Sequence, residues 1–233
     1  MKKILTILLL TLWLVPYSFA QVKFGVETGM NLSHYKTSSR YQAQKKGGME
    51  AGFQLGGTVD YTFCHHWLLI SGASFMQTQS KMELADYMNF YFPNTKIKQN
   101  HIVVPLKVGY NFHLGKKFSL VPFIGIYGSY NFSAGKCPLD IAYPSESGVR
   151  IEKTKWNPMK GYSYIIPNAN LPYDYEAKLS ALRHWTYGGT GGIKAIIADH
   201  YTISFSYYEA IKKVQKQCSL RNYGYQLSVG YQF

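Results

Sequence analysis

The last thirteen residues of the chain, Arg221–Phe233, read RNYGYQLSVGYQF. From Tyr223 to Phe233 every second residue is large and apolar, and the residues between them are small or polar. A period of two predicts a β-strand with two unlike faces. A strand of this length that ends in an aromatic residue is typical of a membrane-spanning strand, which needs about 9–11 residues. The last strand of a soluble β-sandwich is the alternative interpretation.

The opposite end of the chain indicates export. A short basic start, Met1–Lys3, precedes an apolar run over Ile4–Val15, and small residues lead up to Gln21. These features predict a secretory signal peptide over residues 1–20 and a mature domain over residues 21–233. The apolar run is too short for a membrane helix of about 20 residues. We therefore expect an exported protein without a helical anchor in the inner membrane.

The composition is typical of a membrane barrel. Hydrophobic residues make up 46% of the chain, yet no segment of the mature domain is continuously apolar. Charged residues amount to 16%, against an average of about 25% in globular domains. Apolar residues that occupy alternate positions of many strands give this weak hydropathy signal. The net charge of +13 favours phosphorylated outer-membrane lipid, such as lipopolysaccharide, over nucleic acid as the partner of an exported barrel.

Several segments carry the two-residue alternation. In the strictest one, every second residue from Ile102 to Phe112 is apolar. A segment near Trp67 has no clear phase, because Leu68–Ile70 are consecutive apolar residues. The eight predicted strands cover residues 22–33, 51–63, 67–79, 101–113, 118–132, 185–198, a segment that begins at Tyr201, and 221–233.

The lengths of the connections alternate. The short connections lie around residues 64–66, 114–117 and 199–200. The longer ones cover residues 34–50, 80–100, 133–184 and 210–220. Short periplasmic turns and long outer loops are typical of outer-membrane barrels, whose even strand number returns both termini to the periplasm. The sequence therefore predicts an all-β fold, an eight-stranded antiparallel up-and-down transmembrane β-barrel in the outer membrane of a Gram-negative bacterium.

Four charged residues fall on the predicted inward faces of the strands, namely Glu27, Asp60, Lys107 and Lys194. A soluble lipocalin-like barrel would turn its apolar faces inward instead. We expect the four charges to pair as salt bridges inside a narrow polar lumen. Eight strands leave an interior that side chains just fill, so we do not expect an open diffusion pore.

Three motifs resemble a known family. FGVETGMNLS over Phe24–Ser33, VPLKVGY over Val104–Tyr110 and LSVGYQF over Leu227–Phe233 resemble strands of PorT-like outer-membrane β-barrel proteins, which are similar to OmpA-like barrels. The resemblance implies an eight-stranded barrel. Some members of the family assist a protein secretion and surface-attachment system, which implies an envelope protein as partner, but no functional residues carry over. The last strand also resembles strands whose final Phe is read by the barrel-insertion machinery, so Tyr231 and Phe233 are the expected insertion signal.

A lipid-modifying enzyme active at the barrel rim is the alternative to a structural or interaction role. Such an enzyme needs a Ser, a His and a carboxylate near the membrane surface. His34, His101 and His184 lie near the outer ends of predicted strands. Ser33 is adjacent to His34, so the two side chains point to opposite faces of a strand. We therefore expect no catalytic residue.

The sequence contains no cofactor or metal motif. Phosphate-binding loops, dinucleotide fingerprints and zinc spacings do not occur. His65 and His66 share a turn with Cys64, but adjacent positions rarely converge on one ion. We therefore expect no metal site and no cofactor.

The longest predicted loop, residues 133–184, has five prolines and many aromatic residues. A loop of this length is either functional or disordered, and disorder goes with few aromatic residues. We expect partial order, as a cap or a strand extension above the barrel.

Basic residues concentrate in the first and last outer loops. The first and last strands pair in a closed barrel, so these two loops are neighbours. We expect a positive rim that meets lipid phosphates, with ordinary solvated charge as the alternative. The residues of this basic rim are Lys36, Arg40, Lys45, Lys46, Lys212, Lys213, Lys216 and Arg221.

Three cysteines allow at most one disulfide within the chain. Cys64 falls in a predicted periplasmic turn, whereas Cys137 and Cys218 fall in outer loops. A disulfide needs Cα atoms within about 7 Å, and the barrel height is on the order of 25 Å. The intramolecular disulfide that this topology allows is Cys137–Cys218, which would tie the long loop over the last hairpin. Three free thiols are the alternative.

Overall fold

The computed structural model describes residues 22–37, 48–63, 65–85, 91–133, 135–145, 148–166, 175–215 and 220–233. The predicted signal peptide, residues 1–20, lies outside the described residues. Within these ranges no helix is long and apolar enough to cross a membrane.

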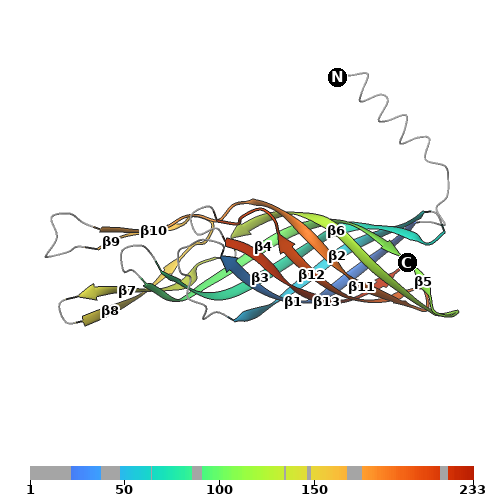
Figure 1. The fold of residues 1–233 in the computed structure, drawn as a ribbon, viewed down its shortest axis with the longest axis horizontal. Coiled ribbons are helices and arrows are strands. Elements are labelled where there is room, and N and C mark those ends of the chain that lie inside the picture. The colour runs from blue at the N-terminus through green and yellow to red at the C-terminus, as the bar shows by residue number, and fades with distance from the viewer. Residues whose placement is uncertain are drawn as a thin grey trace, which may run out of the picture.

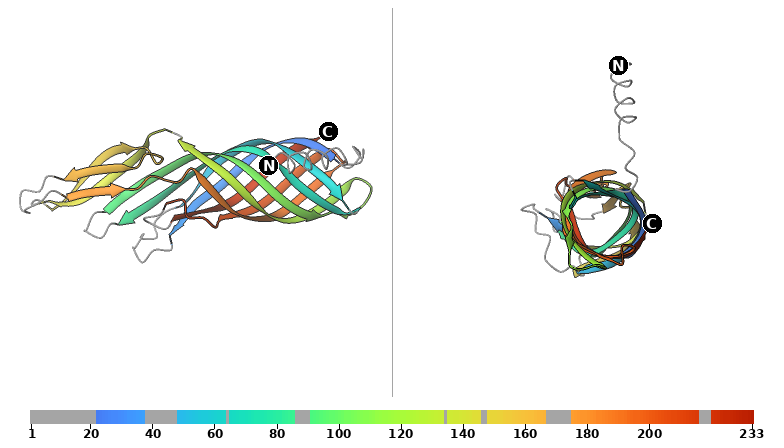
Figure 2. Two further views of the ribbon diagram at one scale, coloured as in Figure 1. Left: turned by 90° about the horizontal axis from the view of Figure 1, so that it is seen from above. Right: turned by 90° about the vertical axis from the view of Figure 1, so that its right-hand side faces the viewer.

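Eight long strands form a closed antiparallel barrel (Figures 1 and 2). Each barrel strand pairs with the next one along the chain, and the last pairs with the first. The predicted fold class is therefore confirmed. A short strand, β5 (Phe112–His113), pairs with β6 beside the barrel. The barrel strands are β1 (Val22–Thr37), β2 (Met49–Phe63), β3 (Trp67–Ala85), β4 (Tyr91–Tyr110), β6 (Phe118–Ser133), β11 (Trp185–Ile197), β12 (Tyr201–Ala210) and β13 (Leu220–Gln232).

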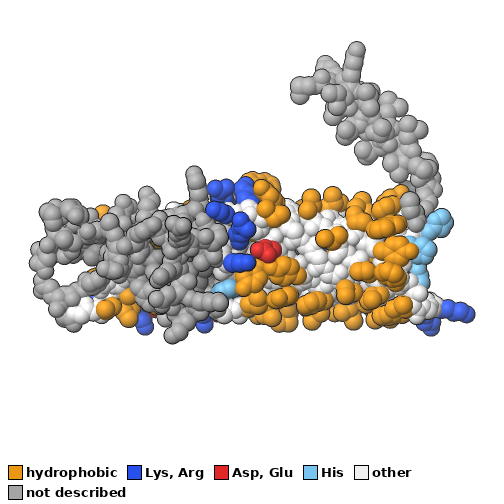
Figure 3. All heavy atoms as spheres, in the orientation of Figure 1, with side chains coloured by type: hydrophobic (Ala, Val, Ile, Leu, Met, Phe, Trp, Pro, Cys, Tyr) orange, Lys and Arg blue, Asp and Glu red, His pale blue; other side chains and the backbone are white. Residues whose placement is uncertain are grey.

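The apolar residues of the alternating segments point outward and form a hydrophobic belt around the barrel (Figure 3). The side chains of Phe24 and Ile124, for example, are 58% and 74% exposed. An apolar surface this large is a lipid-facing surface. The short connections lie at the end of the barrel that holds the C-terminus (Figure 1), which we call the short-turn end. We call the opposite end the extended end.

The phase of β3, which the sequence left open, is set by the lumen. Leu68 and Ile70 point inward and are 3% and 4% exposed. Leu69 lies on the outer face, opposite the lipid-facing Val108 of β4. Both faces of β3 are apolar here because an apolar cluster fills the lumen near the short-turn end. This lower apolar layer consists of Leu68, Ile70, Val121, Phe123 and Ile196.

The chain continues beyond the belt at the extended end. There β7 (Cys137–Ser145) pairs with β8 (Gly148–Trp156) and continues the barrel sheet beside β4. A separate hairpin is formed by β9 (Tyr162–Ile166) and β10 (Tyr175–Leu179). Both hairpins project beyond the barrel (Figure 1). The partial order predicted for residues 133–184 is therefore confirmed in the described part, and we call β7–β10 the strand extension.

A second apolar core, outside the barrel, packs the base of the strand extension. The indole of Trp156 is buried in it and donates a hydrogen bond to the carbonyl oxygen of Lys96 at 3.3 Å. Residues from both ends of the chain meet in this core, so the strand extension rests on the closed barrel. The residues of this extension core are Tyr35, Phe92, Ile97, Cys137, Leu139, Ile141, Trp156, Leu179, Leu182, Val214 and Leu220.

The predicted Cys137–Cys218 disulfide is not formed in the structure. Cys137 is a free thiol, 3% exposed, because its inward position on β7 turns it into the extension core. Cys64 and Cys218 lie outside the described residues. Polar contacts make the connection that the disulfide was expected to make: the Arg183 N–H donates to the Val214 carbonyl oxygen at 2.8 Å.

Candidate functional site

Two of the predicted lumen charges form a buried ion pair. Lys194 Nζ on β11 lies 2.5 Å from Asp60 Oδ2 on β2, and the two side chains are 8% and 3% exposed. Gln232 Nε2 on β13 donates to the same oxygen at 2.6 Å. A buried ion pair needs such additional hydrogen bonds to offset the loss of hydration. Asp60 Oδ1 has no hydrogen-bond partner in the described structure.

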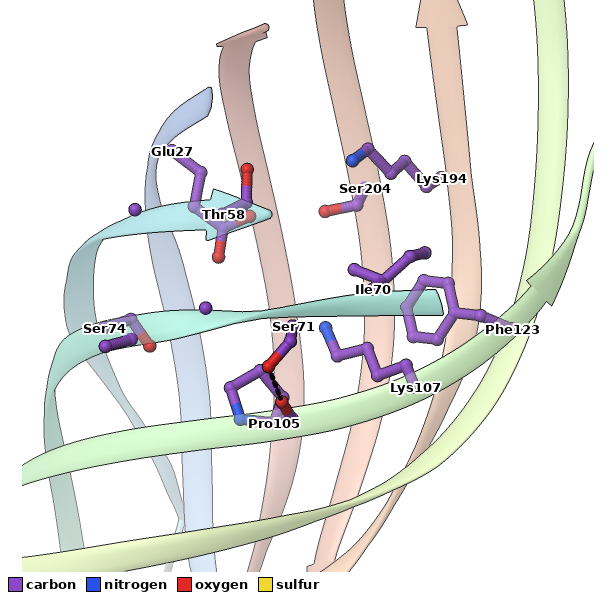
Figure 4. Close-up of a pocket in the computed structure, with 13 residues that line it drawn as sticks. Glu27, Thr58, Ile70, Ser71, Ser74, Pro105, Lys107, Phe123, Lys194 and Ser204 are labelled. Carbon is purple, nitrogen blue, oxygen red and sulfur yellow. Dashed lines mark hydrogen bonds between the residues drawn. The ribbon is translucent and has the colours of Figure 1, made fainter. Parts of the chain in front are cut away.

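The other two lumen charges, Glu27 and Lys107, do not form an ion pair, which corrects the prediction that all four charges pair. Lys107 Nζ lies 4.7 Å from the ring centroid of Phe123, where the aromatic face attracts the cation. Glu27 Oε2 accepts a hydrogen bond from Ser228 Oγ at 3.4 Å. Both residues line the same small cavity in the lumen (Figure 4). Each of these two charges therefore has a separate partner: the Phe123 ring for Lys107 and the Ser228 hydroxyl for Glu27.

Apolar layers lie across the lumen on both sides of this cavity. The lower apolar layer lies toward the short-turn end. An upper apolar layer, made of Met76, Val103, Tyr127 and Tyr208, lies toward the extended end. Side chains of the described residues thus fill the lumen, as expected for eight strands.

One of the rim histidines contacts a serine that the sequence analysis did not single out. His34 Nδ1 lies 3.1 Å from Ser80 Oγ, whereas the neighbouring Ser33 donates to the Gln79 carbonyl oxygen at 2.7 Å. The side chain of Ser80 is 1% exposed. A nucleophile must reach its substrate, and no hydrogen bond joins His34 to a carboxylate in the described structure. The contact therefore lacks two elements of a catalytic triad.

The remaining predicted rim histidines have structural contacts. His101 is buried, and its ring nitrogens lie 2.6 Å from Thr78 Oγ1 and 2.5 Å from Asn131 Oδ1. His184 Nδ1 lies 3.0 Å from the Asn131 carbonyl oxygen. Neither histidine approaches a serine or a carboxylate at hydrogen-bond distance in the described structure. Both positions are explained by the packing of β4, β6 and the start of β11.

The described histidines at the short-turn end contact one another and a neighbouring aromatic ring, and Cys64 of the same turn lies outside the described residues. The ring of His66 stacks on Tyr110 at 5.6 Å between centroids and meets His113 edge-on at 5.7 Å. The neighbouring His65 is exposed. The part of the chain that the structure describes holds no group of three or more His, Cys, Asp or Glu side chains that could ligate a metal ion.

The predicted basic rim is partly described. Lys36 on β1 is the direct cross-strand partner of Arg221 on β13, so the first and last strands bring the two predicted loops together. Lys212 Nζ lies 5.8 Å from the ring centroid of Tyr187. Lys and Arg side chains gather where the hydrophobic belt ends (Figure 3). Of the other predicted rim residues, Lys213 is exposed, and Arg40, Lys45, Lys46 and Lys216 lie outside the described residues.

The predicted insertion signal lies at the short-turn end of the belt. Phe233 is 72% exposed, and its ring lies 5.3 Å from that of Tyr231. Tyr231 in turn stacks on His200 at 5.4 Å. Aromatic side chains in this position are typical of the boundary between lipid and water.

Sequence reasoning missed two features of this arrangement. Gln232, the inward residue between the terminal aromatics, hydrogen-bonds Asp60. Its polar side chain in an alternating strand was the available signal. Trp156 anchors the extension core, although it follows the basic stretch that contains Lys153 and Lys155. A tryptophan that directly follows this polar, basic stretch was the available signal for the extension core.

A closed eight-stranded barrel with an outer apolar belt and a packed lumen defines a small outer-membrane β-barrel protein. Residues 19–216 match a family model described as outer membrane protein beta-barrel domain, and the chain belongs to this family. The protein is therefore located in the outer membrane of a Gram-negative bacterium. No curated relative matches the chain.

Solved structures of other outer-membrane proteins are similar to this chain. The attachment invasion locus protein Ail of Yersinia pestis has 14% identity and a TM-score of 0.37, over 91% of this chain and 99% of that chain. Neisserial surface protein A has 14% identity and a TM-score of 0.43, over 90% and 97% of the two chains. OprG from Pseudomonas aeruginosa has 14% identity and a TM-score of 0.37, over 91% and 94%. These low scores carry no information on function.

Proposed function

We propose that this protein is a non-enzymatic interaction barrel that presents the strand extension outside the cell to an envelope protein. The observation that supports this role is the separate extension core, which orders four strands beyond the membrane-facing belt. Side chains fill the lumen, so the ordered surface lies at the extended end and not along a pore. The alternation of short and long connections supports a periplasmic short-turn end and an extended end that faces the medium.

The outer strand of the extension has the character of a binding surface. β8 is the last strand of its sheet in the described structure, and a strand edge in this position is a template for an added strand. Val149 and Ile151 are 74% and 57% exposed, beyond the lipid-facing belt. Lys153 and Lys155 follow on the same face of β8 and are also exposed. A partner with alternating apolar and acidic residues complements this strand in shape and charge.

The resemblance to PorT-like barrels supports a finer assignment. On that basis the partner is a component of a protein secretion and surface-attachment system, with this barrel as an accessory. We also propose that the barrel-insertion machinery recognises the exposed aromatic pair Tyr231 and Phe233, which ends the last strand. Neither role needs a catalytic group.

Site-specific cross-linking tests the interaction role. A photo-reactive residue replaces Ile165, which is 60% exposed on the strand extension, and the envelope of the native host is irradiated. We expect the photo-reactive chain with no other change to form a cross-link to one protein. The same cross-link should be lost when Lys153→Glu/Lys155→Glu is added. The matched control, Lys116→Glu/Lys117→Glu at the short-turn end, retains the product. A cross-link pattern that is the same in all three chains would overturn the proposal.

The contact between His34 and Ser80 is the observation that favours the enzyme alternative. Lipid A from cells that carry Ser80→Ala tests it. An unchanged acyl pattern, equal to that of the wild type and of cells without the gene, supports the interaction barrel. A pattern shifted in the Ser80→Ala cells in the same way as in cells without the gene would establish the enzyme instead.

A further inference from the structure

We call the pairing of β1 with β13 the seam of the barrel. Along it, the chemical type of the outward-facing residue pairs changes stepwise from the hydrophobic belt toward the extended end. Successive outward-facing pairs are apolar, then aromatic, then cationic. This order matches the passage from acyl chains through the interface to lipid phosphates. From the belt outward, the pairs are Leu32 with Tyr225, His34 with Tyr223, and Lys36 with Arg221.

The outermost pair places two positive charges directly opposite each other. Cross-strand neighbours have Cβ atoms about 4.5–5.5 Å apart, and like charges in that arrangement are destabilising. Neither Lys36 nor Arg221 forms an ion pair with a described carboxylate. The Nε of Arg221 is shielded from solvent and has no hydrogen-bond partner in the described structure. The seam therefore carries a repulsion that the described chain does not offset.

A second pair of like charges on the same rim is treated differently. Lys81 on β3 is the direct cross-strand partner of Lys96 on β4. There the chain supplies an anion, because Glu50 Oε1 lies 3.2 Å from Lys81 Nζ. Lys81 thus has a carboxylate partner in the described structure, whereas Lys36 and Arg221 have none.

The segments that flank the seam cannot supply this anion. Residues 34–49 and 210–220 contain no Asp or Glu. The carboxylate next along the chain from the second segment, Glu209, lies opposite Tyr223 and accepts a hydrogen bond from Tyr207 Oη at 2.8 Å. Within the described residues, Lys36 and Arg221 therefore have no carboxylate counter-ion.

We propose that the phosphate of a phosphorylated glycolipid of the outer leaflet binds between Lys36 and Arg221. Its negative charge acts as the counter-ion of both side chains and offsets their repulsion. The planar guanidinium of Arg221 suits bidentate contact with a phosphate, and Lys36 adds a second positive charge. Beneath them His34 and Tyr223 meet edge-on at 5.9 Å between ring centroids, at the depth of the lipid sugars and glycerol. This binding site is independent of the partner of the strand extension.

Stability in bilayers of defined composition tests the site. The full barrel is reconstituted in phosphatidylcholine vesicles that contain bisphosphorylated lipid A or the same lipid A after removal of its phosphates. We expect the phosphates to lower the unfolding equilibrium constant of the wild type about tenfold, the effect of one charge-assisted contact. We expect no such change in Lys36→Gln/Arg221→Gln. In phosphate-free vesicles this double variant should be at least as stable as the wild type, because the repulsion is gone.

Control measurements separate this site from general surface charge. Lys81→Gln, on the same rim but with a carboxylate partner of its own, should keep the full response to lipid phosphate. Inorganic phosphate at the same concentration should give no stabilisation. An equal response in Lys36→Gln/Arg221→Gln, or a loss in Lys81→Gln, would overturn the proposal. A full response to free phosphate would overturn the assignment to a lipid.

Discussion

The side-chain amide of Gln232 donates a 2.6 Å hydrogen bond to the carboxylate of Asp60 inside the lumen. The same oxygen of Asp60 holds the ammonium of Lys194. These residues lie on β13, β2 and β11, which are not adjacent in the sheet. The Asp60 carboxylate thus links β2 to β11 and β13 across the lumen. These contacts join strands on both sides of the β1–β13 pairing.

Removal of this carboxylate should destabilise the barrel strongly. Asp60→Ala leaves the ammonium of Lys194 buried and unpaired, and breaking a buried pair in this way costs about 3–5 kcal/mol. Urea unfolding of the reconstituted barrel measures the loss. The double variant Asp60→Ala/Lys194→Met should regain most of the stability, because neither charge of this pair is left buried without its partner. Equal stability of Asp60→Ala and the double variant would contradict the role of the pair.

Truncation of the central tryptophan should loosen the strand extension alone. Trp156→Ala opens a cavity in the extension core, with an expected loss of about 3–5 kcal/mol of local stability. Hydrogen exchange should accelerate in β7–β10, while β12 in the barrel wall keeps its protection. The control Ile151→Ala, at a position 57% exposed, should leave both regions unchanged. Faster exchange in β12 would show that the two cores are one unit.

The thiol of Cys137 should resist alkylation in the folded protein. Burial raises the pKa of Cys137, and the nearby backbone and charge of Lys98 oppose this effect only in part. Less thiolate then forms at pH 8, so iodoacetamide should react at least about tenfold faster with the unfolded chain. The folded state favours the neutral thiol. The neutral thiol of Cys137 therefore contributes to the free energy of unfolding below about pH 8.5, the pKa of a thiol in the unfolded chain. The contribution is lost as the pH rises through the higher pKa of the folded state. Equal rates would place Cys137 at the surface.

Labelling of intact cells should distinguish the two ends of the barrel. A single introduced cysteine at Val149 should react with an impermeant maleimide, because this position is 74% exposed on the strand extension. A cysteine at Leu114, 61% exposed at the short-turn end, should react only after the outer membrane is permeabilised. Native cysteines are replaced by serine in both chains. Labelling of the Leu114 position on intact cells would reverse the orientation.

Much of the barrel could be predicted from the sequence, because lipid on one side and a polar lumen on the other impose a period of two. The run from Ile102 to Phe112 shows this directly. The prediction was unclear at Leu68–Ile70, where a lumen layer made both faces of the strand apolar. The period of one strand does not predict which residues fill the lumen. The filling depends on residues of other strands, such as Val121 and Ile196, which pack against Leu68 and Ile70.

The strand extension was predicted only as partial order. Its strands are shorter than those of the barrel, so the apolar alternation, as at Leu139 and Ile141, covers only a few residues. Their buried residues, such as Leu139, pack against Leu182 and Val214, which come from distant parts of the chain. The predicted disulfide at Cys137 is not formed for the same reason: the predicted topology placed Cys137 at the correct end of the barrel but could not show that its thiol points into the extension core.

The composition of the extension core predicts an order of events during assembly. Tyr35 comes from β1, Leu139 from β7 and Leu220 from β13, so the core needs both the first and the last strand of the barrel. Because closing long loops costs conformational entropy, we expect contacts so distant in sequence to form after the intervening chain has been organised. The exposed edge of β8 therefore becomes a fixed surface only once β1 and β13 have joined. A partner that recognises that surface would select finished barrels and ignore those stalled during insertion.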